Sequence, residues 1–246
     1  MLFLKGIKVL NIKKLFNYFN LTEKLIWSIS VVVIIITFFF FKNDGYLTLV
    51  ASLIGVTSLI FCAKGNPIGQ VLMVVFAIIY SIISYSFQYY GEMITYLGMS
   101  LPMAIFALVS WLKNPFDGKK SEVTVNKITS KEVVFMSVLT IFVTIAFYYI
   151  LKYFNTTNLI ASTFSILTSF IAAYLTFRRS PYFALAYAFN DIVLIVLWGF
   201  ASLKDISYFS VIICFVVFLV NDLYGFISWL RMMKRQEKAM KNLLKY

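Results

Sequence analysis

Histidine is absent from this chain of 246 residues, and its absence excludes several kinds of active site together. Histidine is the side chain most often used as a general base near neutral pH, and it is the usual zinc ligand. The Ser-His-Asp and Cys-His arrangements of hydrolases both need it. We therefore expect no catalytic centre, no metal site and no cofactor.

Charged residues are also scarce, at 13% of the sequence, whereas hydrophobic residues make up 61%. Ordinary globular domains contain about 25% charged and roughly 45–50% apolar residues, so this composition excludes a water-soluble fold.

The two cysteines, Cys62 and Cys214, both lie inside apolar runs. A thiol there is usually a small packing residue, and no disulfide framework is expected.

Apolar runs long enough to cross a bilayer, about 17–25 residues, occur eight times. They cover residues 25–41, 46–63, 67–88, 93–112, 133–153, 159–177, 181–203 and 206–230. The end of the first run, Phe38-Phe39-Phe40-Phe41, and the following Lys42 offer no small-residue cleavage site, so we expect a helix here and not a signal peptide. The sequence therefore predicts an all-α integral membrane protein of eight transmembrane helices, with the lipid bilayer as its surroundings.

The basic residues are divided unequally between the two sides of these spans. Eight spans place both termini on one side, and all Lys and Arg residues except Lys42, Lys152 and Lys204 fall on that side. The positive-inside rule therefore predicts cytoplasmic termini and a cytoplasmic loop at residues 113–132. The formal net charge of +12 is explained by this topology, and we expect no nucleic-acid partner.

The two ends of the chain are basic. Residues 1–23 alternate apolar side chains with lysines, as expected of an amphipathic helix on an anionic membrane surface. Residues 231–246 are predicted to form a basic cytoplasmic tail.

An internal repeat relates residues 46–112 to residues 159–230. Three segments match in order: Ala51-Ser52 with Ala161-Ser162, Lys64-Gly65-Asn66-Pro67 with Arg178-Arg179-Ser180-Pro181, and Ser110-Trp111-Leu112-Lys113 with Ser228-Trp229-Leu230-Arg231. Asn66 and Ser180 can each N-cap a helix that begins with proline. We therefore predict two parallel three-helix bundles, preceded by an extra helix at 24–42 and joined by a linker helix at 133–153. A site between the two bundles, near the middle of the membrane, is the natural place for a ligand.

Two acidic residues, Asp191 and Asp222, fall inside predicted spans, and each follows an asparagine, Asn190 or Asn221. An ionisable group inside a bilayer costs at least about 2.5–3.5 kcal/mol and by default marks a pathway or a site. The alternative is that these polar residues only join helices by hydrogen bonds. Both interpretations stay open at this point.

Aromatic residues share helical stripes with these polar pairs. Tyr187 and Trp198 lie at i−4 and i+7 from Asp191, and Tyr224 lies at i+3 from Asn221. Aromatic rings beside amides and carboxylates suit a flat, partly polar ligand that can carry positive charge.

Four segments resemble the PnuC family of nicotinamide riboside transporters. They are Gln88-Tyr89-Tyr90-Gly91, Ser110-Trp111-Leu112-Lys113-Asn114-Pro115-Phe116, Phe177-Arg178-Arg179-Ser180-Pro181 and Asn221-Asp222-Leu223-Tyr224-Gly225-Phe226. The resemblance implies a SWEET-like fold, a homotrimer in the bacterial cytoplasmic membrane, and facilitated diffusion of nicotinamide riboside, which a cytoplasmic kinase then traps by phosphorylation.

The resemblance also implies roles for individual residues. It assigns the glutamine of the third span to Gln88, the aromatic position and polar pair of the seventh span to Tyr187 and Asn190-Asp191, and the polar positions of the eighth span to Asn221 and Tyr224. Tyr187 departs from the tryptophan that is typical of the family. Together with the residues found by spacing, the predicted substrate site consists of Gln88, Tyr187, Asn190, Asp191, Trp198, Asn221, Asp222 and Tyr224.

Other functions remain as alternatives. Relatives in the family handle thiamine, riboflavin or deoxynucleosides. A membrane-embedded enzyme would have to rely on Asp191 and Asp222 without histidine. A channel would use a ring of like polar residues, which two unequal repeats do not supply.

Overall fold

The computed structural model describes residues 17–41, 45–86, 88–156, 158–203 and 206–243. Within these ranges, eight helical segments are long and apolar enough to cross a membrane, which confirms the eight predicted spans. Most of the amphipathic segment predicted at residues 1–23 lies outside the described residues. The elements in chain order are α2 (Leu21–Phe41), α3 (Tyr46–Ala63), α4 (Pro67–Ser86), α5 (Tyr90–Thr95), the π-helical turn η1 (Tyr96–Ser100), α6 (Leu101–Lys113), β1 (Pro115–Phe116), β2 (Lys119–Val123), α7 (Ser130–Tyr153), α8 (Leu159–Phe177), α9 (Phe183–Ser202), the 3₁₀ turn η2 (Ile206–Tyr208) and α10 (Phe209–Leu243).

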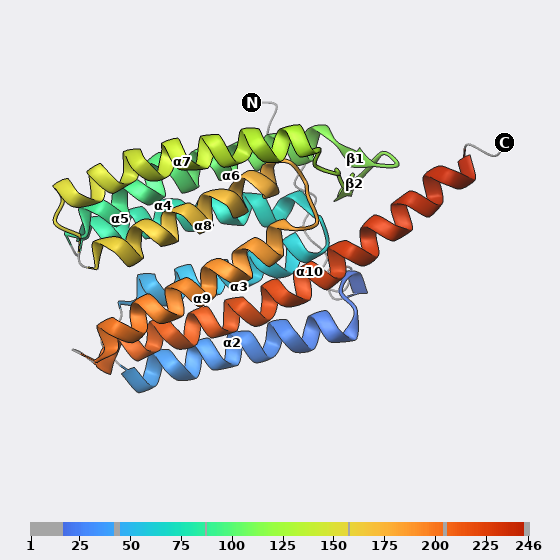
Figure 1. Ribbon diagram of the computed structural model, residues 1–246. Helices are drawn as coiled ribbons and strands as arrows, with labels where there is room; N and C mark the ends of the chain where they lie inside the picture. The colour runs from blue at the N-terminus through green and yellow to red at the C-terminus, as the bar shows by residue number, and fades with distance from the viewer. Residues whose placement is uncertain (1–16, 42–44, 87, 157, 204–205, 244–246) are drawn as a thin grey trace, which may run out of the picture.

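The helices of the two repeats close into a ring. In the first repeat α4 packs between α3 and α6, and in the second α9 packs between α8 and α10. Contacts of α3 with α10 and of α6 with α8 join the two halves. Outside the ring, α2 lies along α3 and α10 on one flank, and α7 lies along α8 on the opposite flank (Figure 1).

The helices α2 and α7 begin in the same way, which extends the repeat beyond the three helices predicted for each half. Asn20 and Glu23 exchange backbone-to-side-chain hydrogen bonds at the start of α2, and the Thr129 side chain accepts from the Glu132 amide at the start of α7. Glu23 then pairs with Lys64, and Glu132 pairs with Arg178, the equivalent residue of the second repeat. The helix predicted as a linker is therefore the counterpart of α2.

The beginning of α2, the end of α10 and the β1–β2 hairpin lie at one end of the molecule, which we call the hairpin end; the other is the distal end (Figure 1). The turns before α4 and α9 also lie there. As predicted, Asn66 caps α4, since its Oδ1 accepts from the Ile68 amide at 3.0 Å. The prediction that Ser180 caps a helix beginning at Pro181 was wrong, because α9 begins only at Phe183 and no side chain caps it; Ser180 Oγ accepts from the Tyr182 amide at 3.4 Å within the preceding turn.

Residues 231–243 are helical, whereas the sequence predicted a basic tail at 231–246. The helix α10 is continuous over 35 residues, which at 1.5 Å per residue exceeds the roughly 30 Å of a bilayer core. No glycine or proline follows Gly225, and the residues after Trp229 are mostly strong helix formers. The last turns of α10 consequently project beyond the other helices (Figure 1).

Pro102 changes the hydrogen bonding of the fourth span. Since proline has no amide N–H, the preceding turn widens into η1, in which the Leu101 amide bonds to the Tyr96 carbonyl five residues earlier. Turns of this kind are frequent at functional sites. The span also begins earlier than predicted, at Tyr90, and so includes the acidic residue Glu92.

The helices α3 and α4 approach each other closely at Gly69, whose carbonyl accepts a 2.8 Å hydrogen bond from Ser58 Oγ. A Cβ at this position would lie 2.5 Å from Cys62 Sγ and 2.8 Å from the Cys62 amide nitrogen. We expect Gly69→Ala to destabilise the protein by about 1–3 kcal/mol through overpacking, seen as a lower thermal midpoint in detergent. Gly199→Ala is the control, because its Cβ would meet nothing within 4 Å. Equal midpoints for the two variants would contradict the close approach.

Candidate functional site

Two carboxyl groups meet between α9 and α10. The side chains of Asp191 and Asp222 interact directly, and the two residues are only 4% and 5% exposed. Asp191 Oδ2 is buried without a hydrogen-bond partner among the described residues. Two carboxylates in contact repel each other when both are ionised, and burial strengthens that repulsion. A positive charge or a hydrogen-bond donor brought to this pair would be strongly stabilised.

Tyr187 and Cys62 lie beside the carboxyl pair, and Gln70 is joined to it through Cys62. Tyr187 lies one turn before Asp191 on α9, and its hydroxyl is hydrogen-bonded to Thr176 of α8. Cys62 of α3 receives a 3.3 Å hydrogen bond from Gln70 Nε2 of α4, and Asp222 interacts electrostatically with both Cys62 and Tyr187. Four helices of the ring, α3, α4, α9 and α10, therefore contribute to one polar group, which we call the acid cluster: Cys62, Gln70, Tyr187, Asp191 and Asp222.

Gln70 and Cys62 were not among the predicted site residues. Gln70 is 3% exposed, and a buried amide in an apolar span one turn after Pro67 is a usable signal. Cys62 gave no such signal, because a thiol in an apolar run is usually a packing residue.

Two tryptophans close the ring on the hairpin-end side of the acid cluster. Trp111 on α6 donates to the Thr176 carbonyl of α8 at 2.9 Å, and Trp229 on α10 donates to the Cys62 carbonyl of α3 at 2.8 Å. Trp111 and Trp229 are equivalent residues of the two repeats, so each half donates the same indole hydrogen bond to a backbone carbonyl of the other half.

The two indole rings are fully buried and lie 5.4 Å apart between centroids. Phe183 packs 4.9 Å from the Trp229 ring, and its own ring lies 6.4 Å from that of Tyr187. We call Trp111, Phe183 and Trp229 the tryptophan lock. It is continuous with the acid cluster through Tyr187.

The second strand of the hairpin and the residues that follow it hold both halves together at this end. The Val123 amide donates to the Gly65 carbonyl at 2.9 Å, and the Asn126 amide donates to the Arg179 carbonyl at 3.0 Å. Gly65 and Arg179 are equivalent residues of the repeat, both with positive φ. The side chain of Gln236 on α10 holds the same segment by hydrogen bonds to the backbone of Val123 and Val125. We call residues 119–126 the strap.

The Arg179 guanidinium belongs to this fastening. It donates to the Thr124 carbonyl of the strap at 3.1 Å and to Ser110 Oγ at 2.7 Å. Burial lowers the pKa of Arg179, and the charge of Arg178 beside it acts in the same direction. An arginine keeps its proton in spite of such a shift, so the contact is a charged one.

A second aromatic group, which the sequence analysis did not identify, lies toward the distal end. The Tyr80 ring packs 4.6 Å from Phe76 and 5.1 Å from Tyr96 in η1, and Glu92 is an electrostatic neighbour of both tyrosines. The spacings Phe76–Tyr80 and Glu92–Tyr96, each of four residues, were readable from the sequence. Tyr80 is also bonded to Ser52 of α3.

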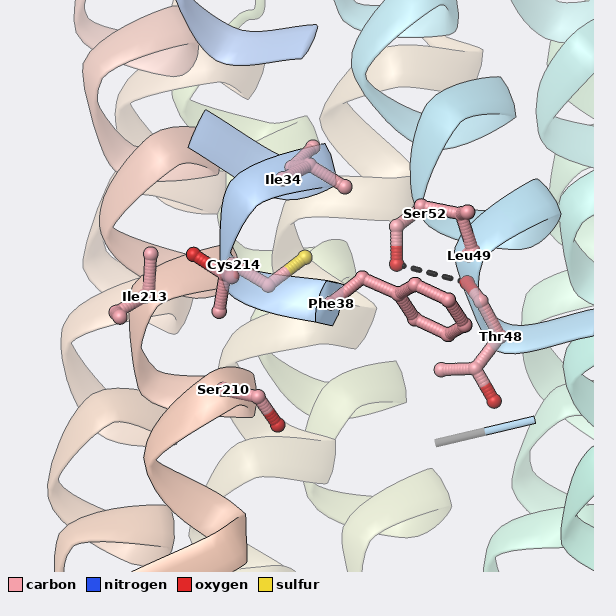
Figure 2. Close-up of a pocket in the computed structure, with 9 residues that line it drawn as sticks. Ile34, Phe38, Thr48, Leu49, Ser52, Ser210, Ile213 and Cys214 are labelled. Carbon is pink, nitrogen blue, oxygen red and sulfur yellow. Dashed lines mark hydrogen bonds between the residues drawn. The ribbon is translucent and has the colours of Figure 1, made fainter. Parts of the chain in front are cut away.

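Ser52 lines a small hollow of about 30 Å³ between α2, α3 and α10. Figure 2 shows Ser52 and Cys214 on its two sides, with Ser52 Oγ bonded to the Thr48 carbonyl at 2.9 Å. A hollow of this size holds about one water molecule. This hollow is therefore too small to be a ligand-binding site.

The predicted site residues Tyr187, Asp191 and Asp222 are brought together in the acid cluster, and Asn190 lies beside them. Asn190 Oδ1 accepts a 2.7 Å hydrogen bond from Thr168 Oγ1 and so joins α9 to α8. Whether Asn190 also touches a ligand stays a prediction.

Asn221 and Tyr224 lie on a different face of α10 and contact α2. Asn221 Nδ2 donates to Ser30 Oγ at 2.9 Å, and the Tyr224 hydroxyl donates to Glu23 Oε1 at 3.3 Å. In this arrangement both residues join α2 to the ring.

Gln88 and Trp198 lie away from the acid cluster, toward the distal end. Gln88 is exposed in the turn after α4, with φ of 59°. The Trp198 ring packs 5.3 Å from Tyr208, whose hydroxyl is 3.2 Å from that of Tyr89. The ligand roles of these two residues stay predictions.

A ring of membrane-spanning helices around a buried polar group, closed at one end, has the architecture of a small-molecule transporter. The family model described as "Nicotinamide mononucleotide transporter" matches residues 45–231, and the chain belongs to this family. It is 23% identical over 214 residues to the nicotinamide riboside transporter PnuC of Neisseria mucosa, covering 85% of this chain and 81% of that protein. A crystal structure of the vitamin B3 transporter PnuC has the same fold, with a TM-score of 0.74, 21% identity, and coverage of 89% of this chain and 94% of the other.

Proposed function

We propose that this protein carries nicotinamide riboside across the bacterial cytoplasmic membrane and that the acid cluster is its substrate site. The observation that carries the proposal is the buried carboxyl pair with an unpartnered oxygen, Asp191 Oδ2, beside the ring of Tyr187. Nicotinamide riboside joins a flat pyridinium cation to a ribose. The cation would relieve the repulsion of the two carboxylates and pack on the tyrosine ring, and the ribose hydroxyls would bond to Gln70 or the carboxylates.

The same chemistry ranks the other ligands of the family. Thiamine also carries a cationic ring and is the second candidate. Riboflavin and deoxynucleosides are neutral, and they would leave the Asp191–Asp222 repulsion uncompensated.

The tryptophan lock and the strap would form the inner closure of an alternating-access cycle. The positive-inside argument places the hairpin end and both termini in the cytoplasm. With the lock closed, the acid cluster would receive substrate from the distal side. Separation of α6 from α8 and of α10 from α3 would release the substrate to the cytoplasm. Assembly of three such chains into a homotrimer stays a prediction from the family resemblance.

We expect transport to be uniport. Purified protein in vesicles should equilibrate labelled nicotinamide riboside down its own gradient, and collapsing proton and sodium gradients should leave the initial rate unchanged. Net accumulation should appear only when a phosphorylating enzyme and ATP are enclosed, because phosphorylation removes the free substrate. The measurement is the time course of vesicle-retained label.

Empty vesicles and excess unlabelled substrate are the controls for this measurement. Accumulation driven by an imposed proton or sodium gradient without any kinase would refute uniport. It would point to the Asp191–Asp222 pair as the coupling group, because coupling usually uses a titrating carboxylate or histidine inside the membrane.

A further inference from the structure

A hollow of about 380 Å³ lies at the hairpin end, separate from the acid cluster. Its walls are the end of α3, the strap and the projecting part of α10, and Tyr18 closes one side. Met232 lines the hollow and also belongs to the apolar core that contains Trp111 and Trp229, so the hollow adjoins the packing of the tryptophan lock.

The charges around the hollow do not cancel. Lys64 Nζ pairs with both carboxylate oxygens of Glu23 at 3.0 and 3.1 Å. Arg235 pairs with Glu122 of the strap. Arg231 also lines the hollow, but it forms no ion pair within the described part of the chain. The Arg231 guanidinium is therefore available to bind a ligand.

The unequal repeat leaves a hydroxyl free in the same place. In the first repeat, Ser110 receives a hydrogen bond from Arg179. In the second, the equivalent serine is Ser228, and the residue in the place of Arg179 is Gly65, which has no side chain. Ser228 lines the hollow, and its hydroxyl has no hydrogen-bond partner among the residues that the structure describes.

We propose that this hollow binds the phosphate group of a small polar molecule and that a bound phosphate holds the inner closure shut. Arg231 would supply charge-assisted hydrogen bonds, and the hydroxyls of Ser228 and Ser121 would supply further donors. The volume accepts a sugar or nucleoside monophosphate. Because Ser121 belongs to the strap and Arg231 to α10, one phosphate would fasten the strap to α10 beside the lock.

A ligand that binds only the closed arrangement shifts the population toward it. The effect on transport therefore rests on the proposed function, whereas the binding itself does not. A phosphorylated molecule accumulating in the cytoplasm would slow further entry of substrate. The phosphate could instead belong to the headgroup of an anionic lipid, since the hollow opens near the end of the membrane-spanning region.

The test compares the full chain with Arg231→Gln, Ser228→Ala and the matched control Lys234→Gln. Lys234 is an exposed base on the same helix that does not line the hollow. Binding to the unmodified protein is measured by calorimetry in neutral detergent with three probes: ribose 5-phosphate, inorganic phosphate and ribose. The two probes that contain phosphate should bind saturably, and ribose should not bind. Arg231→Gln should weaken binding about tenfold or more, Ser228→Ala should weaken it less, and Lys234→Gln should leave it unchanged.

A second arm distinguishes a lipid source. Mass spectrometry should count the phosphatidylglycerol retained by each variant after purification from a mixture with phosphatidylcholine. Retention that Arg231→Gln abolishes and Lys234→Gln preserves, without binding of the soluble probe, would assign the hollow to a lipid phosphate. If Arg231→Gln and Lys234→Gln reduce binding or retention equally, the effect comes from the general surface charge, and the proposal is overturned. Absence of both binding and retention would overturn it as well, whatever the transport assay gives.

Discussion

Asp191→Asn and Asp222→Asn should each lower the affinity for nicotinamide riboside by about 30-fold or more. Removing one member of a buried, hydrogen-bonded charge contact costs about 2–5 kcal/mol, and each 1.4 kcal/mol is a tenfold change in affinity. Asparagine keeps the size of the side chain, so the packing of α9 against α10 should survive. Binding of labelled substrate to purified protein measures the effect.

Asn221→Leu is the matched control for this experiment. Its amide bonds to Ser30 of α2 and to the Val217 carbonyl of its own helix, so it should lower the thermal midpoint while the folded protein still binds substrate. Asn190→Leu should reduce binding if the amide also contacts the ligand. If the aspartate variants bind as tightly as the unmodified chain, the acid cluster is not the substrate site.

The number of the spans and their approximate positions could be predicted because they depend on local sequence. Apolar length, the Asn66 cap and the unequal distribution of basic residues each act within a few residues of the chain. The end of α10 was missed because a basic stretch outside the membrane was taken for a tail. The helix propensity of this stretch could be read from the sequence, but the contact of Gln236 with the strap could not.

The site was predicted only in part, because the direction of each polar side chain depends on helix rotation. Asn221 and Asp222 are adjacent, and a step of one residue turns the side chain by about 100°. The carboxyl group of Asp222 therefore meets α9, while Asn221 and Tyr224 meet α2. Protein covers α10 on both sides, so polar residues occur on two faces and the pattern of apolar residues does not separate them.

Gln88 and Trp198 show a related difficulty. Both lie close to span ends in the sequence, where an aromatic or polar residue can face a pathway or the membrane surface. The structure places Gln88 in an exposed turn and Trp198 against Tyr208. Only the positions of the neighbouring helices decide between these environments.

Trp229→Ala should open the hairpin end of the ring. The change removes the 2.8 Å hydrogen bond to the Cys62 carbonyl and the contacts with Trp111 and Phe183. Deleting a buried tryptophan side chain costs about 3–5 kcal/mol. If most of this loss falls on the closed arrangement, the open population should rise by about 100-fold or more.

The chain contains its own reporter for that opening. Cys62 is 4% exposed and lies directly at the lock, since its carbonyl is the acceptor of the Trp229 bond. In a Cys214→Ser background, a membrane-impermeant thiol reagent applied to the predicted cytoplasmic side should label Cys62 slowly in the unmodified lock and much faster in Trp229→Ala. Trp229→Phe keeps most of the volume but loses the N–H donor, so an intermediate rate is expected and guards against a variant that does not fold.

The control for the labelling experiment is Trp27→Ala. Trp27 lies on α2 outside the ring, partly exposed, and its indole bonds to Thr57. Its loss removes an indole of the same size without touching the lock, and the Cys62 labelling rate should not change. Equal acceleration in the Trp27 and Trp229 variants would mean that general loosening exposes Cys62. Acceleration by Trp229→Ala and by the equivalent Trp111→Ala alone would show that the two exchanged tryptophans together hold this end of the pathway shut.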